Sequence, residues 1–302
     1  MNKIVNIIKP TGMTSHDVVS VVRRTLNIKK VGHTGTLDPD AAGVLPICIG
    51  KATKVSELIL NKDKSYICEL TLGITTDTYD SSGEIIDRVD NFSYTKEEIE
   101  KAFETQRGHI DQLPPIYSAL KVNGKRMCDL VRSGRADEIK LKTRPVNIKK
   151  LEILSINDNK IMFYVMCSKG TYVRSICYDI GKVLGCGGHM SFLLRTSSGK
   201  FNLENAITLE QLQEYKENNT LEEHLYDIDY VLSNFNSLSI HPNARKYYVN
   251  GGIIDERRFT QKDFNKNDEI VRVYCEGEFL GSGKLIKKGS EISVKSDKLF
   301  IV

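Results

Sequence analysis

The sequence predicts an α+β fold followed by a small β-rich domain. Helical and strand-like patterns are interspersed from the N-terminus to about Asn236. Beyond Ser237 the pattern changes to short β-like runs interrupted by Gly and Lys. The length of 302 residues also exceeds the size at which single cores stop growing. We therefore expect a main domain over residues 1–236 and a smaller domain over residues 237–302.

Capping patterns and hydrophobic spacing predict four helices in the main domain. Thr14 and Asp17 have the spacing of a capping box and precede a Val-rich stretch with helical periodicity. Gly185 stands where a helix that follows Gly170 would need its C-terminal cap. The predicted helices are Ser15–Leu26, a helix that opens at Thr95, Thr171–Leu184, and an acidic helix from Thr208 to about Leu225.

Strands are predicted where apolar residues alternate with polar ones. Tyr66, Cys68, Leu70 and Leu72 would share one face of such a strand. A Gly-rich loop over residues 30–43 leads into the apolar run Val44–Ile49. The predicted strands are Lys64–Leu72, Ile116–Val122, Val146–Ile156, Ile161–Ser168, Glu269–Tyr274, Glu278–Ile286 and Glu291–Val302.

Composition narrows the class of protein. Hydrophobic residues make up 40% and charged residues 27% of the chain, which excludes a disordered, collagen-like or disulfide-scaffold protein. We see neither a membrane span nor a signal peptide and expect a cytoplasmic protein. The seven cysteines are scattered along the chain, and we expect them to be reduced residues of the core. Cys186 and His189 have a spacing seen in zinc sites, but one pair alone is a weak signal, so we expect no metal.

The net charge of +4 conceals a strong local asymmetry. Residues 101–150 hold twelve Lys and Arg against five Asp and Glu, whereas residues 204–230 hold one Lys against eight acids. A basic segment of this kind can neutralise phosphates and release their counterions, which makes nucleic acid a plausible partner. A solvated charged surface is the alternative explanation, and charge alone does not decide between the two.

Asp38 is the first candidate for chemistry. Pro39 biases Asp38 toward extended backbone geometry, and Gly35 and Gly43 permit another chain or a ligand to approach closely. A carboxylate presented on such a loop can serve as a nucleophile or base. Alternatively, Asp38 caps the turn that follows it.

Arg174 is the second candidate, because it stands in the first turn of a predicted helix. A cation is electrostatically unfavourable there, so an anionic partner, either a carboxylate or a phosphate, would explain its position. The alternative is an arginine whose head group extends into solvent at the surface.

Several stretches, in order, resemble the TruB family of tRNA pseudouridine synthases. The resemblance covers residues 7–206, and the C-terminal part around Gly277–Gly283 resembles the small PUA-type RNA-binding domain of these enzymes. The matching motifs are Lys9–Ser15, Gly32–Pro39 continuing through Leu45, Lys64–Tyr66, Pro114–Lys121, Gly170–Ser175 and Leu193–Thr196.

The resemblance implies a pseudouridine synthase fold, with a central, mostly antiparallel mixed sheet flanked by helices and a PUA-like domain. It implies that Asp38, Tyr66 and Arg174 are the catalytic residues: Asp38 is the essential nucleophile, Tyr66 stacks on the flipped uracil or moves its proton, and Arg174 pairs with Asp38. A phenol ionises too little at neutral pH to be an effective base, so stacking is the safer role for Tyr66. The residues that the resemblance places at the substrate are His33, Tyr172, Leu193 and Lys9.

The implied reaction is the isomerisation of uridine to pseudouridine at position 55, in the T loop of tRNA, without cofactor or metal. Extrusion of the base would precede the chemistry. Asp38 would attack C6 of the base, attack C1′ of the ribose, or abstract a ribose proton, and all three routes remain open. The expected partner is the T arm of tRNA, with no membrane, no required protein partner and a monomeric chain.

Three other functions would also use parts of this sequence. A non-catalytic tRNA-binding or tRNA-folding protein needs only the basic segment and the tail. A nucleoside hydrolase needs a water-activating acid or a metal near Asp38, and no such cluster is visible. A guide-RNA-dependent relative is the third. Asp40 is a further acid beside Asp38, and we expect it to point to solvent.

Overall fold

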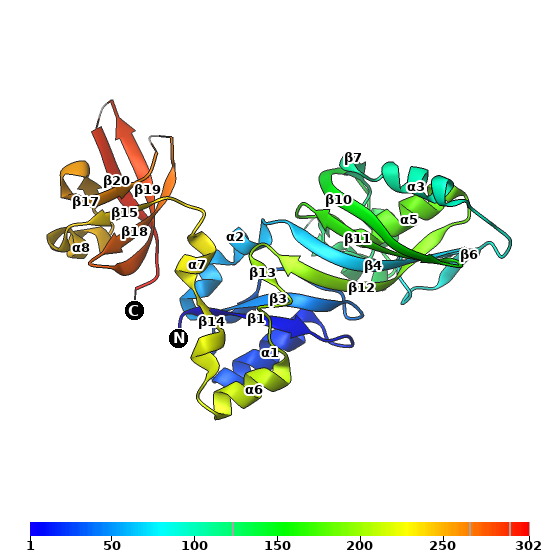
Figure 1. Ribbon diagram of the computed structural model, residues 1–302, viewed down its shortest axis with the longest axis horizontal. Coiled ribbons are helices and arrows are strands. Elements are labelled where there is room, and N and C mark those ends of the chain that lie inside the picture. Colours follow the sequence, from blue (N-terminus) through cyan, green and yellow to red (C-terminus); the bar gives the residue numbers. More distant parts are fainter. Residues whose placement is uncertain (123, 266, 290, 302) are drawn as a thin grey trace.

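The computed structural model describes residues 1–122, 124–265, 267–289 and 291–301. Its centre is a ten-stranded mixed sheet that runs through the larger part of the molecule (Figure 1). The path is β14 (Leu225–Asp227), β1 (Lys3–Lys9), β3 (Ala42–Ile49), β12 (Gly188–Ser198), β4 (Lys64–Leu72), β11 (Lys160–Cys167), β10 (Arg144–Asn157) and β7 (Gly108–Gln112). Two short strands lie off this path, β2 (Val31–His33) beside β3 and β13 (Phe201–Asn202) beside β12.

All neighbours along this path are antiparallel except β3 and β12, which pair in parallel through Leu194 and Ala42 and through Arg195 and Gly43. Gly43 is required at this contact, because its φ is +113° and a Cβ atom would lie 2.2 Å from the carbonyl oxygen of Arg195. The predicted mixed, mostly antiparallel sheet is therefore confirmed.

Helices cover the sheet at two places (Figure 1). α1 (Ser15–Leu26) and α6 (Leu209–Glu217) lie together under β1 and β3, where Val18, Val22 and Leu212 share a core with Val5. α3 (Lys96–Glu104) and α5 (Val173–Leu184) cover the other end. The remaining helices are α2 (Ser56–Leu60), α4 (Met127–Arg132), α7 (Ile228–Leu232) and α8 (Pro242–Val249).

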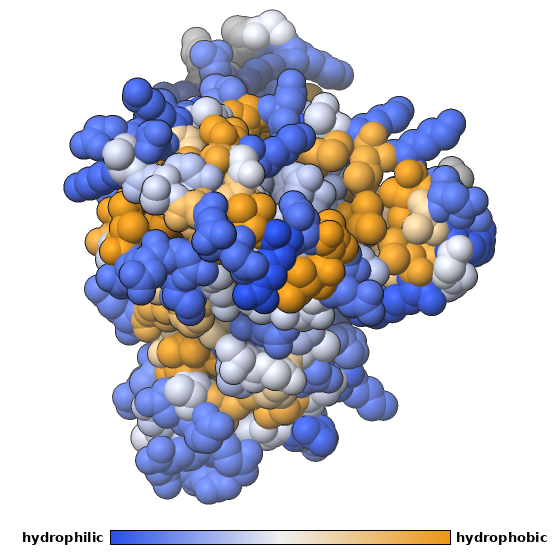
Figure 2. Space-filling view, turned by 90° about the vertical axis from the view of Figure 1, so that its right-hand side faces the viewer, coloured by the Kyte–Doolittle hydropathy of each residue, from blue (hydrophilic) through white to orange (hydrophobic). Residues whose placement is uncertain are grey.

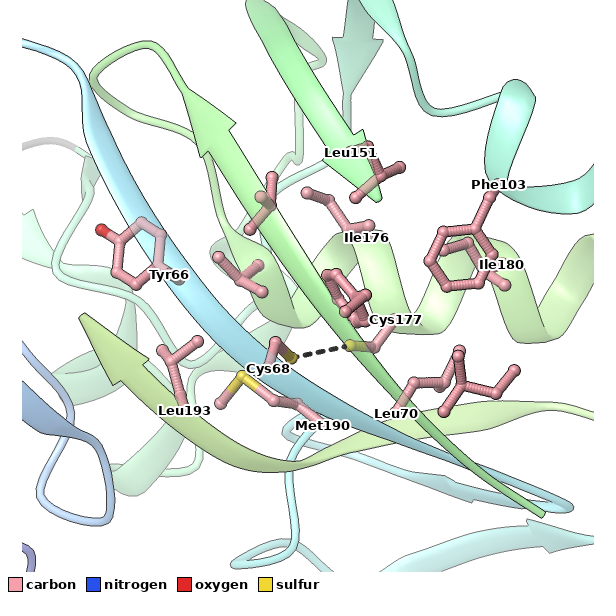
Figure 3. Packing of buried hydrophobic residues seen from close by; sticks show 14 of the residues in the cluster. Tyr66, Cys68, Leu70, Phe103, Leu151, Ile176, Cys177, Ile180, Met190 and Leu193 are labelled. Atoms are coloured by element: carbon pink, nitrogen blue, oxygen red, sulfur yellow. Dashed lines mark hydrogen bonds between the residues drawn. The ribbon is translucent and has the colours of Figure 1, made fainter. Parts of the chain in front are cut away.

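One face of β4 packs against α5 in a hydrophobic core (Figure 3). Cys68 of β4 faces Cys177 of α5 with their sulfur atoms 3.6 Å apart, and both thiols are free. Tyr66, which precedes Cys68 on the same face of β4, lies near Leu193 of β12. Hydrophobic packing thus fixes the strand on which Tyr66 stands.

The C-terminal residues form a six-stranded sheet with its own core around Tyr248, Val271 and Val294. Its order is β16 (Ile253–Asp255), β20 (Glu291–Leu299), β19 (Glu278–Lys288), β18 (Ile270–Cys275), β15 (Ser237–Ile240) and β17 (Phe259–Asp263). This is the β-rich, PUA-like domain that the sequence predicted. Phe300 packs against the core that contains Ile4 and Val44 and so ties this domain to the larger one.

Four predicted elements were wrong in extent. The segment 116–122 is a strand only at β8 (Lys121–Val122), which pairs with β9 (Lys125–Arg126), because Ser118 and Leu120 instead accept hydrogen bonds from the start of α4. The acidic helix ends at Glu217, beyond which Asn219 has a φ of 59°. The Gly-rich loop contains the unpredicted strand β2. The last strand, predicted to reach Val302, ends at Leu299, and Val302 lies outside the described residues.

A long connection between β4 and α3 forms the hairpin of β5 (Ile74–Thr76) and β6 (Ile85–Arg88). Figure 2 faces the end of the molecule that carries β6, and there hydrophilic residues separate the apolar patches. Ile85 and Ile86 of β6 are exposed. No helix in the described ranges is long and apolar enough to cross a membrane.

Candidate active site

Asp38 lies on the loop that joins β2 to β3, and that loop is held rigidly at several points. Ser15 at the start of α1 accepts a hydrogen bond from the amide of Leu37 at 2.9 Å and donates one to its carbonyl at 3.2 Å. The amide of Thr34 donates to the carbonyl of Pro46. The Asp38 side chain itself stays 42% exposed, so an ordered loop presents a carboxylate that a substrate can reach.

Lys9 secures the same loop from beneath. Its ammonium group is fully buried and donates to the carbonyl oxygens of Pro10, Met13 and Pro39 at 2.7, 2.6 and 3.0 Å. Burial lowers the pKa of Lys9 to about 8. Because Lys9 has no exposed surface and its three protons go to carbonyls, the predicted contact between Lys9 and substrate finds no support in this geometry.

Arg174, in the first turn of α5, contacts Asp38, Asp80 and two backbone carbonyls. Its side chain is 8% exposed, and its guanidinium forms ion pairs with Asp38 at 3.1 Å and with Asp80 at 3.2 Å. It also donates to the carbonyl oxygens of Thr78 and Tyr117, both at 3.2 Å. The anionic partner that its position at a helix N-terminus demanded is therefore a pair of carboxylates.

Several features of the site act on the pKa of the Asp38 carboxyl in opposite directions. Burial is the largest and raises the pKa of its carboxyl above the ordinary value, whereas Arg174 lowers it. The neighbouring carboxylates of Asp80 and Asp40 raise it further, and Lys9 lowers it. Asp40 is exposed, as expected. Arg174 thus supports the ionised form of Asp38 in surroundings that otherwise disfavour it.

Tyr66 stands opposite Arg195 in the pairing of β4 with β12. Tyr66 is 9% exposed, and burial raises the pKa of its phenol to about 12, which Arg195 partly opposes. A neutral phenol fits stacking on a base better than it fits proton abstraction at neutral pH.

Arg195 is fully buried beneath the Asp38 loop. Its Nε donates to the carbonyl of Val44 at 2.7 Å and its Nη1 to that of Thr36 at 3.5 Å, on either side of Asp38. Nη2 has no hydrogen-bond partner among the described residues. Arg195 therefore holds the loop at both ends, and a positive charge lies close to the site.

The remaining predicted residues surround this centre without joining the ion-pair network. His33 is half-buried, burial lowers its pKa, and its Nδ1 accepts a hydrogen bond of 3.4 Å from the Gly35 amide. Tyr172 precedes α5, and its backbone amide and carbonyl are both held by Gln112. Leu193 is buried near Tyr66 (Figure 3).

The Cys186 and His189 pair gains no third ligand. His189 Nδ1 lies 3.0 Å from the carbonyl oxygen of Ile74, and Cys186 is buried. Within the described part of the chain, no group of three or more His, Cys, Asp or Glu residues is arranged to hold a metal ion.

Sequence reasoning missed Asp80 and did not assign a role to Arg195. Asp80 lies in a run of Thr, Asp, Ser and Gly, whose density of turn-forming polar residues is a signal for an ordered loop. Arg195 interrupts an apolar strand, and a charge in such a run indicates a buried polar contact.

Comparisons with known proteins give the same fold over nearly the whole chain. A chain in the structure of an H/ACA RNP bound to a substrate RNA containing 2′-deoxyuridine superposes with a TM-score of 0.75 at 25% identity, covering 99% of this chain and 85% of that chain. A chain of a Cbf5-Nop10-Gar1 complex matches with a TM-score of 0.75, 27% identity and the same coverage.

Family models identify the class. A model of the N-terminal domain of TruB family pseudouridylate synthases matches residues 23–173, and one of the tRNA pseudouridylate synthase B C-terminal domain matches residues 174–233. The fold is therefore that of a pseudouridine synthase, as predicted.

Full-length relatives place the chain within that class. The tRNA pseudouridine synthase B of Clostridioides difficile (strain 630) is 73% identical over 301 residues, which is 100% of both chains. That of Alkaliphilus oremlandii (strain OhILAs) is 49% identical over 94% of this chain and 93% of its own. The chain belongs to the TruB family.

Proposed function

We propose that this chain isomerises uridine to pseudouridine at position 55, in the T loop of tRNA, with Asp38 as the catalytic residue. The observation that carries the proposal is the Asp38 carboxylate itself. One of its oxygens pairs with Arg174, and the side chain remains 42% exposed. The relatives in Clostridioides difficile and Alkaliphilus oremlandii are named for this class of reaction on tRNA.

The site supplies what this rearrangement requires. The glycosidic bond to N1 breaks and one to C5 forms, while C5 loses its hydrogen to solvent as a proton and N1 gains a proton, so the product is an isomer of uridine. Arg174 holds Asp38 in place and favours its ionised form. Tyr66 stacks on the flipped uracil, Tyr172 and Leu193 line its pocket, and His33 contacts the RNA where the base is extruded. Extrusion costs a few kcal/mol, which stacking and phosphate contacts offset.

The basic segment is attached directly to this site, which supports a role in holding RNA. The carbonyl of Tyr117 accepts a hydrogen bond from Arg174, and the carbonyl of Leu113 accepts one from Ser175. The chain then continues into α4 and its surroundings, where most of the basic side chains are exposed. These exposed residues are Lys121, Lys125, Arg126, Arg132, Lys140, Lys142 and Arg144.

We infer further that the T arm lies along this segment, that the PUA-like domain adds contacts to the RNA, and that the chain acts as a monomer in the cytoplasm without a required protein partner. Size-exclusion chromatography with light scattering, with and without tRNA, tests the monomer; a mass of two chains in the active complex contradicts it.

Tritium release from a tRNA transcript labelled with 5-³H-uridine tests the reaction. The wild-type chain is expected to release tritium, and the Asp38→Asn chain is not. A transcript in which the T-loop uridine is replaced by cytidine is expected to release none. Release from that transcript would contradict the target position.

The same variant separates catalysis from tRNA binding or folding. Asp38→Asn keeps the fold, so it should still bind the transcript in a filter-binding assay. If the wild-type chain binds tightly but releases no tritium from any tRNA, the chain is a binding or folding protein and the proposed reaction is wrong.

The role of the basic segment predicts a strong salt dependence. Each phosphate contact contributes a slope of about −0.9 to the plot of log affinity against log salt for a duplex. Six contacts would lower the affinity by about three orders of magnitude between 50 and 200 mM salt. A flat dependence would contradict the placement of RNA on this segment.

A further inference from the structure

The turn that carries Asp80 contains a strained residue. Tyr79 has a φ of +63°, a left-handed conformation that bulky side chains rarely adopt. It lies between the two groups of this turn that Arg174 holds, because Nη1 of Arg174 is 3.2 Å both from the carbonyl oxygen of Thr78 and from a carboxylate oxygen of Asp80. The left-handed residue therefore directs the carbonyl before it and the carboxylate after it toward the same nitrogen.

The ring of Tyr79 is packed against the helix that carries Arg174. It stacks on Tyr178 of α5 with ring centroids 4.0 Å apart and an angle of 17° between the ring planes. Tyr178 is four residues after Arg174, so both project from one face of α5. One face of the helix thus holds the turn twice, through the ion pair with Asp80 and through the stacked rings.

Backbone contacts fix the other side of this turn to β12. The amide of Met190 donates to the carbonyl of Tyr79 at 3.0 Å, and the amide of Ser81 donates to the carbonyl of Met190 at 3.1 Å. The second carboxylate oxygen of Asp80 accepts hydrogen bonds from the Thr78 hydroxyl at 2.7 Å and from the Ser82 amide at 3.0 Å. Asp80 is thereby aimed at Arg174, and the strain at Tyr79 is sustained by these contacts.

We propose that the stacked pair Tyr79 and Tyr178 positions Asp80, and through it Arg174 and Asp38, for the reaction. The inference rests on the proposed function, and both tyrosines are positioning residues. They act through the orientation of the Arg174 guanidinium, so their loss lowers the rate of the chemical step and leaves tRNA affinity unchanged. Stacking needs the rings and not the hydroxyl groups, so phenylalanine should replace either tyrosine.

The test compares full-length variants in single-turnover tritium release with a tRNA transcript, alongside tRNA dissociation constants. Because small misplacements of catalytic groups cost up to about 100-fold, we expect Tyr178→Ala to lower the rate about tenfold, with the dissociation constant within about twofold of wild type. Tyr79→Gly should behave in the same way, although glycine adopts the left-handed backbone without strain. Tyr79→Phe and Tyr178→Phe should keep the wild-type rate.

The molecule offers a matched control. Tyr215 stacks on His224, also with centroids 4.0 Å apart, in the helical segment that contains α6. Tyr215→Ala removes a comparable stack away from the site and should leave the single-turnover rate unchanged. A similar loss of rate in Tyr215→Ala would show that any lost stack reduces the rate, and would overturn the proposal.

A double-variant cycle with Asp80→Asn shows whether the stack acts through Asp80. If it does, Tyr178→Ala costs less than about twofold once Asp80 is Asn, because the group it positions is already lost. Independent, multiplicative effects would overturn the proposal, as would a wild-type rate in Tyr178→Ala or a tenfold loss in the Phe variants. An inactive wild-type chain would instead refute the proposed function, so the two failures are distinguishable.

Discussion

Two arginine–aspartate pairs in this molecule are built alike and differ in how completely the aspartate is bound. Arg272 of β18 reaches Asp229 of α7 at 3.2 Å and also donates to the carbonyl of Phe235, much as Arg174 reaches Asp38 and two carbonyls. The second oxygen of Asp229 accepts a bond of 2.7 Å from the Tyr274 hydroxyl. Among the described residues, no hydrogen-bond donor reaches the second oxygen of Asp38.

The difference separates a fully bound structural pair from one that leaves an oxygen available, as the proposed reaction requires. Asp229 has both oxygens bound and is 30% exposed, so it joins the two domains and has no oxygen left for a reactant. Asp38 is held by one oxygen and keeps the other available, and burial together with Asp80 and Asp40 makes its charge less favourable. A partly satisfied carboxylate is costly to a fold, which is why such groups concentrate at functional sites.

The largest effect expected from this comparison is that of Asp38→Asn. The amide keeps the shape and loses the anion, so the single-turnover rate should fall by at least about 10⁴-fold. Tritium release measures the rate, and the unfolding midpoint in urea should not fall. A residual rate within tenfold of wild type would remove Asp38 from the chemistry.

Arg174→Lys is expected to have the next largest effect. One ammonium group cannot bridge two carboxylates and two carbonyls as the planar guanidinium does, so the rate should fall about 100-fold. Arg272→Lys is the matched control and should keep the wild-type rate. Equal losses of rate in both variants would contradict the distinction between the two pairs, because the Arg272 pair would then affect catalysis as much as the Arg174 pair.

Asp80→Asn should lower the maximal rate about tenfold and shift the pH profile, because Arg174 loses one anchor while a negative charge disappears near Asp38. The groups that act on the Asp38 carboxyl are Arg174 and Lys9, which lower its pKa, and Asp80 and Asp40, which raise it. Removing the charge of Asp80 therefore lowers the pKa of Asp38, and the acid limb of the single-turnover profile should move to lower pH. A limb that moves to higher pH would contradict this electrostatic assignment.

Asp229→Asn should change stability and spare catalysis. The variant weakens the bonds from Arg272 and Tyr274, which should cost about 1–3 kcal/mol of the free energy of unfolding. Urea denaturation measures the loss, and tritium release should be unchanged. A loss of rate without a loss of stability would place Asp229 in the reaction.

Local signals in the sequence were sufficient where an element depends on its own residues. The helix Ser15–Leu26 was predicted with its observed bounds because its capping box is reciprocal, and Lys64–Leu72 because its alternation is regular. The segment 116–122 failed because its carbonyls are taken by α4. The hydrophobic pattern alone carried no sign of that contact.

The sequence predicted those residues of the site that stand in recognisable local motifs. Asp38 and Arg174 were both singled out, and the structure brings them together. Asp80 was missed because its importance comes from an arginine 94 residues further along the chain. Lys9 was placed at the substrate by the resemblance alone, and nothing in the sequence indicated the three carbonyls that enclose its ammonium group.

The contacts of Arg174 also bear on how the chain folds. One guanidinium joins α5 to the Asp38 loop, to the turn at residues 78–80 and to Tyr117, over sequence separations that include 94 and 57 residues. Contacts this distant in sequence form late, because closing the intervening loops costs entropy before any contact is gained. The central sheet depends on pairings just as distant, such as Tyr66 with Arg195 and Gly43 with Arg195. In refolding, turnover should therefore return only when these long-range contacts are complete, and it reports completion of the native topology.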